Sequence, residues 1–302
     1  MRAWREFQKH LGKAGLKYQE IKSWRLEQLS TFLEARSNLR GLQLSAGRPR
    51  EYAQALAKLK EVVGHTLLLC GGTRPCKLHR MLFESIKPKG VISFNYDLIA
   101  DQTLLEMGRL NWRRAYYRGS EFARVVSDRG VSYSRRIGSA RVRRSIPLIK
   151  LHGSIHWQKL KRGGGYRISG CRLPEDHNET FQLVYVPQPP YLIPPVAAKI
   201  EIKDVALRKR WYLAVGHLHK ARTWIIWGYS FPQTDTIAQV MFRTALSRNR
   251  RPKRVIVVNP DVSTENRVMD VCRKVKVEQF SSMETFLVEL GVLSERRAES
   301  ST

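Results

Sequence analysis

The pattern of apolar and polar positions predicts helices in the first quarter of the chain. In "SWRLEQLSTFLEARSNL" (23–39) the apolar residues recur at near-helical spacing. The next segment, "PREYAQALAKLKEVVG" (49–64), opens with a proline, which is favoured in the first turn of a helix. We therefore expect a helical N-terminal segment over residues 1–75.

From residue 76 onward, short apolar runs alternate with amphipathic segments. The amphipathic segments predict helices, and the apolar runs predict buried strands. Such an alternation is typical of a parallel sheet between two layers of helices. We expect an α/β domain over residues 76–290, three-layered and Rossmann-like, with a mostly parallel sheet and helices on both faces. The predicted strands are "VISF" (91–94), "IPLIKLHGS" (146–154), "FQLVYV" (181–186), "TWIIWGYSF" (223–231) and "RVIVVNPD" (254–261).

Two regions depart from this alternation. Residues 112–145 contain ten arginines against only Glu121 and Asp128, without a strong period, and predict a basic insertion. Residues 291–302 are polar and predict a disordered tail.

The charge balance indicates an anionic partner. The chain has 54 Lys and Arg against 26 Asp and Glu, a net charge of +28. Such an excess attracts nucleic acid, anionic membranes or acidic metabolites such as dinucleotides, although a solvated basic surface is the alternative. Four cysteines without a Cys-x-x-Cys pair predict reduced thiols in a cytoplasmic protein and no zinc site. We expect no signal peptide and no membrane-spanning helix, because no long apolar run is present.

Polar and glycine residues stand where four predicted strands end. The carboxyl ends of parallel strands meet at one edge of a sheet, where ligands bind in open α/β folds. An amide, a carboxylate, an imidazole, a hydroxyl and glycines at that edge would form a site for a nucleotide. These residues are Asn95 and Asp97; His152 and Gly153; Gly228, Tyr229 and Ser230; and Asn259 and Asp261.

Each of these residues also has a purely structural interpretation. Asn and Asp after a strand often cap the next helix, a single His is often a satisfied structural residue, and Gly-Tyr-Ser is a common turn. If all of them were structural, the chain would be an interaction scaffold. Replacing Asn95 and His152 would then change stability and no activity.

Taken together, the strand ends resemble the sirtuin-like family, in particular its bacterial NAD-consuming branch. "SFNYD" (93–97) is similar to the family's Gln-Asn-x-Asp motif, and "LIKLHGSIHW" (148–157) to the segment with its catalytic His-Gly. "LHRMLFESIKPKG" (78–90), "LIPPVAAK" (192–199), "IIWGYSFPQTD" (225–235) and "VIVVNPD" (255–261) resemble that branch in the same order. The resemblance covers roughly residues 76–290.

The resemblance implies cleavage of the bond between nicotinamide and ribose in NAD⁺, which is a substrate here, and no metal. Asp97 would hold the carboxamide, and Asn95 would position the ribose or a water molecule. His152 would accept a proton, a task that suits its titration near neutral pH. The other residues would line the cofactor site: Ser93, Gly153, Gly228, Tyr229, Ser230, Asn259 and Asp261.

Two features of the family are missing. No strand followed by a Gly-Ala-Gly phosphate loop precedes residue 76, and "TLLLCGGTRPC" (66–76) is the only glycine-rich candidate for a strand, turn and helix. The paired zinc cysteines of deacetylating sirtuins are also missing, which disfavours peptide deacetylation.

Two functions follow from this pattern. The first is an NAD⁺ glycohydrolase of antiphage defence that acts as a homo-oligomer or with a partner protein of the same defence system. The second is a catalytically impaired module that binds a nucleotide or nucleic acid through its basic surface. Binding that weakens steeply with salt would favour the second.

Overall fold

The structure is a computed structural model. It describes residues 2–38, 48–72, 74–109, 146–159, 166–168, 171–172, 182–183, 189–193, 205–233, 235–248, 254–273 and 275–294. The expected basic insertion, residues 112–145, lies outside the described residues.

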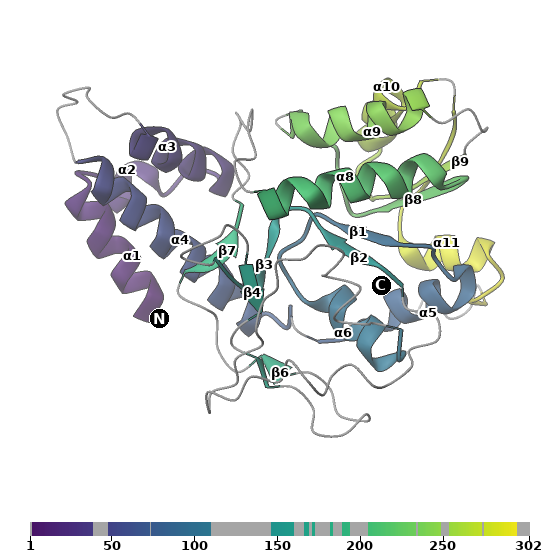
Figure 1. The fold of residues 1–302 in the computed structure, drawn as a ribbon, viewed down its shortest axis with the longest axis horizontal. Coiled ribbons are helices and arrows are strands. Elements are labelled where there is room, and N and C mark those ends of the chain that lie inside the picture. The colour runs from purple at the N-terminus through teal and green to yellow at the C-terminus, as the bar shows by residue number, and fades with distance from the viewer. Residues whose placement is uncertain are drawn as a thin grey trace.

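Helices make up most of the described chain (Figure 1). In chain order they are α1 (Arg2–Lys13), α2 (Tyr18–Ile21), α3 (Leu26–Asn38), α4 (Pro49–Leu69), α5 (Lys77–Ile86), α6 (Ile99–Glu106), α8 (Val205–Lys220), α9 (Thr236–Arg248), α10 (Ser263–Val271) and α11 (Met283–Glu289).

The strands of the described residues form two parallel and two antiparallel sheets. β1 pairs with β2, and β8, β9 and β10 are parallel in the order β10-β9-β8. β3 lies between β4 and β7 in an antiparallel sheet, and β5 pairs with β6. The strands are β1 (Val91–Ser93), β2 (Leu148–Lys150), β3 (Gly153–Lys159), β4 (Tyr166–Ile168), β5 (Cys171–Arg172), β6 (Gln182–Leu183), β7 (Pro190–Leu192), β8 (Thr223–Trp227), β9 (Arg254–Val258) and β10 (Lys276–Phe280).

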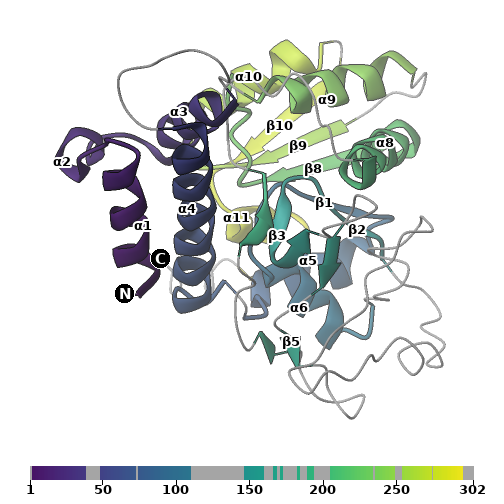
Figure 2. The ribbon, with the colours of Figure 1, turned by 60° about the vertical axis from the view of Figure 1, so that its left-hand side comes forward.

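The expected three-layer α/β architecture is confirmed, and β9 shows why the sequence forms it. Successive side chains of a strand point to opposite faces. Val255 and Val257 join one core with α8, α9 and α10. Ile256 and Val258 join another core with α5, α6 and α11. The part of a strand that is covered on both faces has to be apolar, as residues 255–258 of β9 are, whereas Arg254 at the start of β9 is exposed. Figures 1 and 2 show the two helix layers on either side of the parallel strands.

Within this architecture, the parallel strands fall into two hydrogen-bonded groups. Figures 1 and 2 show β1 between β2 and β8, and among the described strands β1 is hydrogen-bonded only to β2. The two groups still share a core, because Ile149 and Leu151 pack with Trp224 and Ile226.

The N-terminal helices have a core of their own. α1 and α3 both pack on α4, and Phe7, Leu33 and Tyr52 are buried in this cluster. All four helices from α1 to α4 lie within residues 1–75. Figure 2 shows α4 between α1 and the strands of the α/β part.

Several local predictions differ from the structure. Residues 66–69 end helix α4, so the glycine-rich candidate "TLLLCGGTRPC" (66–76) does not open with a strand. β3 and β10 were not predicted; β10 carries charged Lys276 and Glu278, which obscured its strand pattern. Residues 291–294, which we expected in the tail, are described, and Val292 and Leu293 are partly buried against the core. The rest of the tail lies outside the described residues.

A buried ion pair fixes the ends of β1 and β2. Lys150 Nζ lies 3.0 Å from Asp101 Oδ2, and each side chain is 1% exposed. The same ammonium donates a hydrogen bond to the backbone carbonyl of Asp97. A buried ammonium requires such acceptors, because burial without them costs several kcal/mol. Lys150 therefore ties α6 and the loop after β1 to β2.

His79 of α5 is a second titratable group near this loop, and its side chain is partly buried. Its ring packs against Trp227 with the ring planes tilted by 34° and the centroids 4.1 Å apart, and its buried Nδ1 has no hydrogen-bond partner among the described residues. Burial lowers the pKa of His79 to about 4, although nearby Asp97 acts in the opposite direction. The contact therefore requires a neutral imidazole.

We expect Lys150→Met to destabilise the protein by about 3–5 kcal/mol, because it leaves Asp101 buried without its counter-ion. The double variant Lys150→Met/Asp101→Leu should recover most of this loss. Free energies of unfolding from urea titration measure both. Arg80→Met, which breaks an exposed pair with Glu84, is the control and should change stability by under about 1 kcal/mol. A double variant as unstable as the single one would contradict this assignment.

We expect the His79 contact to lose stability in acid. The folded pKa of about 4 lies below the ordinary value of 6.5, so the unfolded state takes up the proton first. The contribution of neutral His79 to the free energy of unfolding is complete above pH 6.5 and is lost as the pH falls to 4. After allowance for partial exposure it amounts to about 2 kcal/mol. Urea titrations of wild type and His79→Gln across this range isolate the effect. Parallel curves for the two proteins would show that His79 does not titrate as described.

Candidate functional site

The ends of β1 and β2 place His152 beside the residues after β1. Ser93 is in register with Lys150, and Leu151 N donates to Ser93 O at 3.0 Å. Phe94 and His152 therefore leave the same edge of the sheet, with ring centroids 5.5 Å apart. His152 is 8% exposed, so its imidazole is largely shielded from water.

Aromatic rings surround this imidazole. Trp211 of α8 lies 5.8 Å from the His152 ring, centroid to centroid. Phe94 stacks on Tyr229 at 4.0 Å, which brings the end of β8 against the end of β1. The rings exclude water, and charges interact more strongly where water is excluded.

Asp235 supplies a carboxylate to His152. The distance from His152 Nε2 to Asp235 Oδ2 is 3.5 Å, and Asp235 is also 8% exposed. Tyr229 donates its hydroxyl to Oδ2 at 3.0 Å, and Ala238 N donates to Oδ1 at 3.4 Å. Burial, followed by Asp235, raises the pKa of Tyr229, so its hydroxyl remains a donor. A carboxylate in this position orients an imidazole and stabilises its protonated form.

Sequence reasoning missed Asp235. It is the last residue of the quoted "IIWGYSFPQTD" and precedes α9 directly, where an acidic residue is ordinarily a helix cap. The hydrogen bond from Ala238 N to Asp235 Oδ1 shows that Asp235 also caps α9. Only the tertiary structure shows its second contact, with His152.

The loop after β1, residues 95–97, is fixed by hydrogen bonds to β1, β3 and α6. Tyr96 O accepts from Ser154 Oγ at 3.2 Å and from Ile155 N at 3.0 Å. Asp97 Oδ1 accepts from Ile99 N at 3.1 Å, which is the helix-capping role weighed above. The Asn95 side chain is exposed, and its backbone N donates to Ser93 Oγ at 3.2 Å. Asn95 is thus presented to solvent by a fixed backbone.

The glycine-rich segment at residues 71–72 lies against this loop. Leu98 N donates to Gly72 O at 2.6 Å. A Cβ at Gly72 would lie 2.8 Å from Leu67 O and 3.2 Å from the Cβ of Asp97, so a larger residue does not fit. The segment therefore follows helix α4 rather than a strand. It nevertheless contacts Asp97 and Leu98 beside the predicted site.

Gly153, directly after His152, is required by a close approach of two backbones. Its φ is +87°, and a Cβ would lie 2.0 Å from Tyr191 O of β7. Position 153 therefore requires glycine because β7 approaches its backbone closely.

The ends of β8 and β9 are joined by Arg267 of α10. Gly228, with φ +69°, donates its N–H to Val258 O at 2.9 Å. Arg267 donates to Ser230 O at 2.7 Å and to Asp261 Oδ2 at 2.6 Å. Arg267, a cation at this edge, was not predicted from the sequence.

Asn259 and Asp261 make local turn contacts. Asn259 Oδ1 accepts from Asp261 N at 2.9 Å, and Asp261 Oδ1 accepts from Ser263 N at 3.0 Å. Hydrogen bonds from Ser263 and then from Arg267 lower the pKa of Asp261 to about 2. These two side chains therefore stabilise the start of α10, as the structural interpretation predicts for residues after a strand.

The structure thus joins His152, Phe94, Tyr229 and Asp235 by direct contacts, and Ser230 and Asp261 through Arg267. Asn95 and Asp97 follow β1 at the same edge, where Asn95 N donates to Ser93 Oγ and Asp97 Oδ1 accepts from Ile99 N. Within the described residues, no group of three or more His, Cys, Asp or Glu side chains could hold a metal ion. None of the described helices is long and apolar enough to cross a membrane.

Comparisons with known proteins found similar solved structures only. No family model matches the sequence, and no curated protein matches it. A Sir2 homologue in complex with ADP-ribose is 14% identical, with 90% of each chain covered and a TM-score of 0.45. A Sir2 protein with a p53 peptide and NAD⁺ is 11% identical, covering 86% of this chain and 90% of that chain, with a TM-score of 0.43. The structural neighbours are therefore Sir2 homologues, at a level of similarity that leaves function to be inferred from this chain's own residues.

Proposed function

We propose that the chain is a sirtuin-like NAD⁺ glycohydrolase that acts in antiphage defence, where loss of NAD⁺ is the output. The observation that carries the proposal is the His152–Asp235 pair, 3.5 Å apart and shielded by aromatic rings at the carboxyl ends of parallel strands. The motif resemblance at residues 93–97 and 148–157 supports the choice of NAD⁺ as substrate.

The reaction breaks the bond between nicotinamide and the ribose C1′, and water supplies the new C1′–O bond. Nicotinamide leaves without protonation, because its ring nitrogen is cationic in NAD⁺. The transition state resembles an oxocarbenium ion, as in glycoside hydrolysis. The products are nicotinamide, ADP-ribose and a proton, and the protein has to accept that proton and orient the reactants.

His152 is the proposed base. It takes the proton of the attacking water, and the Asp235 carboxylate stabilises the imidazolium that forms. Asn95, exposed at the end of β1, would position the water or the ribose. Asp97 would bind the carboxamide through Oδ2, because Oδ1 accepts from Ile99. Arg267 would attract the pyrophosphate toward the end of β8, where Ser230 lies.

We expect purified protein to release nicotinamide and ADP-ribose from NAD⁺, and His152→Ala to lower this rate about 10²–10⁴-fold, the usual contribution of a general base. Asp235→Asn should also lower the rate, since it keeps the shape and removes the charge. His65→Ala, on α4, is the matched control and should retain the wild-type rate. Nucleotides are quantified by liquid chromatography and mass spectrometry.

The assay is repeated with lysate from phage-infected cells, which supplies a partner or trigger from the defence system. Equal turnover by wild type and His152→Ala would exclude His152 as the base. No nicotinamide release above the lysate background, with or without infection, would exclude the glycohydrolase itself.

A second candidate function, nucleic-acid binding, is favoured by the surface of α8 and α9. The two helices pack together and contain no Asp or Glu (Figure 1). Arg208 and Lys209 are exposed on α8, and the adjacent Tyr212 is 75% exposed. Exposed cations beside an aromatic ring suit a nucleic-acid backbone and a stacked base.

For this candidate, we expect a fluorescent single-stranded DNA to bind with an affinity that falls steeply between 50 and 200 mM salt, as counterion release requires. The double variant Arg208→Glu/Lys209→Glu should weaken binding at least about tenfold in fluorescence anisotropy. Lys9→Glu/Lys13→Glu, on exposed positions of α1, makes the same change in net charge and serves as the control. Equal losses in the two double variants would indicate net charge rather than a site on α8.

A further inference from the structure

Two side chains meet at one oxygen of the Asp235 carboxylate. Tyr229 Oη lies 3.0 Å from Asp235 Oδ2, and His152 Nε2 lies 3.5 Å from the same atom. The other oxygen, Oδ1, accepts from Ala238 N at 3.4 Å. A carboxylate oxygen has lone pairs for two donors, but each donor stabilises part of its negative charge. The shorter of the two contacts at Oδ2 is the one with Tyr229.

The position of the Tyr229 hydroxyl is set by the packing of its ring. The ring stacks on Phe94, with the centroids 4.0 Å apart and the planes 13° from parallel. It also meets Phe231 edge to face at a centroid distance of 4.9 Å, and Phe231 is 1% exposed. A tyrosine ring held by two neighbouring rings has little freedom to move. Its hydroxyl is therefore directed at Asp235 before any substrate binds.

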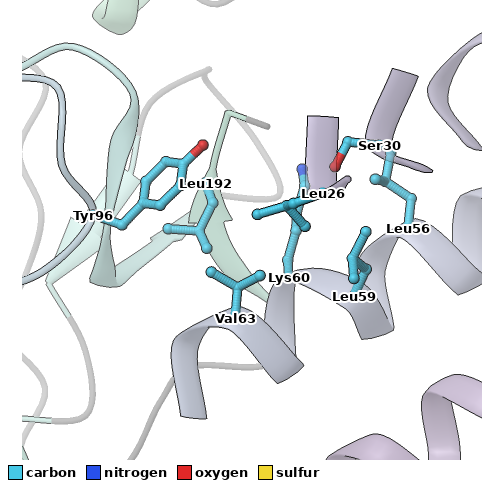
Figure 3. A pocket seen from close by; sticks show the side chains of 8 residues that line it. All are labelled: Leu26, Ser30, Leu56, Leu59, Lys60, Val63, Tyr96 and Leu192. Atoms are coloured by element: carbon cyan, nitrogen blue, oxygen red, sulfur yellow. The ribbon is translucent and has the colours of Figure 1, made fainter. Parts of the chain in front are cut away.

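Tyr96, in the loop after β1, is another tyrosine on which Asp235 acts. Burial, followed by Asp235, raises its pKa, and its hydroxyl donates to Ile193 O. Figure 3 shows its ring at a small pocket that Leu192 of β7 and Val63 of α4 also line. The Tyr96 hydroxyl therefore keeps its proton and binds a backbone carbonyl instead of the Asp235 carboxylate.

Cations on the neighbouring elements also have partners of their own. Each donates to another group: Lys150 of β2 to Asp101, Arg210 of α8 to the Tyr166 hydroxyl, and Arg267 of α10 to Ser230 O. Within the described part of the chain, His152 is the only basic side chain within 4.0 Å of the Asp235 carboxylate. The negative charge of Asp235 is therefore shared between His152 and its two hydrogen-bond donors, the Tyr229 hydroxyl and Ala238 N.

We propose that Tyr229 is a positioning residue that limits the hold of Asp235 on His152. By donating to Oδ2, its hydroxyl keeps the carboxylate 3.5 Å from the imidazole and shares its negative charge. His152 then remains neutral, as a base has to be before it accepts a proton, and Asp235 still stabilises the imidazolium once it forms. The role in turnover rests on the proposed function, whereas the effect on the titration of His152 does not.

The titration of His152 tests this inference without substrate. Its imidazole signal is followed by ¹H–¹³C NMR of the full chain from about pH 5 to 9 and is assigned by its loss in His152→Gln. Tyr229→Phe keeps the ring and removes the hydroxyl. We expect the midpoint to rise by about one pH unit, because Asp235 loses a competing hydrogen bond and favours the imidazolium more strongly.

Two further variants complete the titration. Asp235→Asn removes the charge and should lower the midpoint, so it shifts the titration in the opposite direction to Tyr229→Phe. Tyr52→Phe, in the N-terminal core, removes the hydroxyl of another buried tyrosine and is the matched control. It should titrate as wild type. A midpoint that is unchanged or lowered in Tyr229→Phe would overturn the proposal.

The pH profile of nicotinamide release then measures the contribution to turnover. On the acid side of the profile, Tyr229→Phe should be about tenfold slower than wild type at the same pH, because more of its His152 is protonated. The two rates should converge at alkaline pH, and Tyr52→Phe should match wild type throughout. A loss of rate that is equal at every pH would show a merely structural role and overturn the proposal. No nicotinamide release by wild type would overturn the glycohydrolase instead, and the NMR midpoints would still decide whether Tyr229 controls the pair.

Discussion

The parallel pairing of β1 with β2 is the constraint on which the candidate site depends. It sets the loop after β1 beside His152, and one buried ammonium holds the arrangement in place. Lys150 extends from the last residue of β2, pairs with Asp101 of α6 and binds the Asp97 carbonyl. A charge at this depth has few alternative positions, because any displacement would leave it without acceptors. The backbone that presents Asn95 and Asp97 is therefore defined by Lys150, which lies outside their own segment, residues 93–97.

The site illustrates how one side chain serves both the fold and chemistry. Asp235 caps α9 and contacts His152, and Asp97 caps α6 at the edge where a substrate would lie. Helix caps are rigid because they satisfy backbone N–H groups that otherwise lack partners. A carboxylate held by a cap is thereby oriented in advance, which benefits any group that has to meet a substrate in a defined geometry.

The N-terminal helices contribute to the site indirectly. Their core is separate, but Lys60 and Val63 of α4 face Tyr96, whose neighbours are Asn95 and Asp97. Tyr96 is fixed by Ser154 and Ile155 of β3 and by Ile193 after β7. A ligand or partner that altered the packing of α4 would therefore act on the backbone of the loop through contacts that already exist.

Local sequence determined much of the architecture. The apolar runs at β1, β8 and β9 and their alternation with amphipathic segments were predicted, because burial on one or two faces imposes a period that neighbouring residues reveal. The order of polar residues after these strands likewise indicated where a site would lie. Glycine at residue 153 was visible in the sequence, although its partner on β7 was not.

Tertiary structure decided the rest, because it depends on contacts between residues far apart in the chain. The sequence does not show that Asp235 meets His152, that Lys150 meets Asp101, or that Arg267 joins Ser230 to Asp261. Asn259 and Asp261 are predicted to line the cofactor site, and in the structure they also accept hydrogen bonds in the turn after β9, because the same polar atoms suit either role. Patterning determines which face of an element is buried, whereas the partner of a polar group is chosen only when the elements meet.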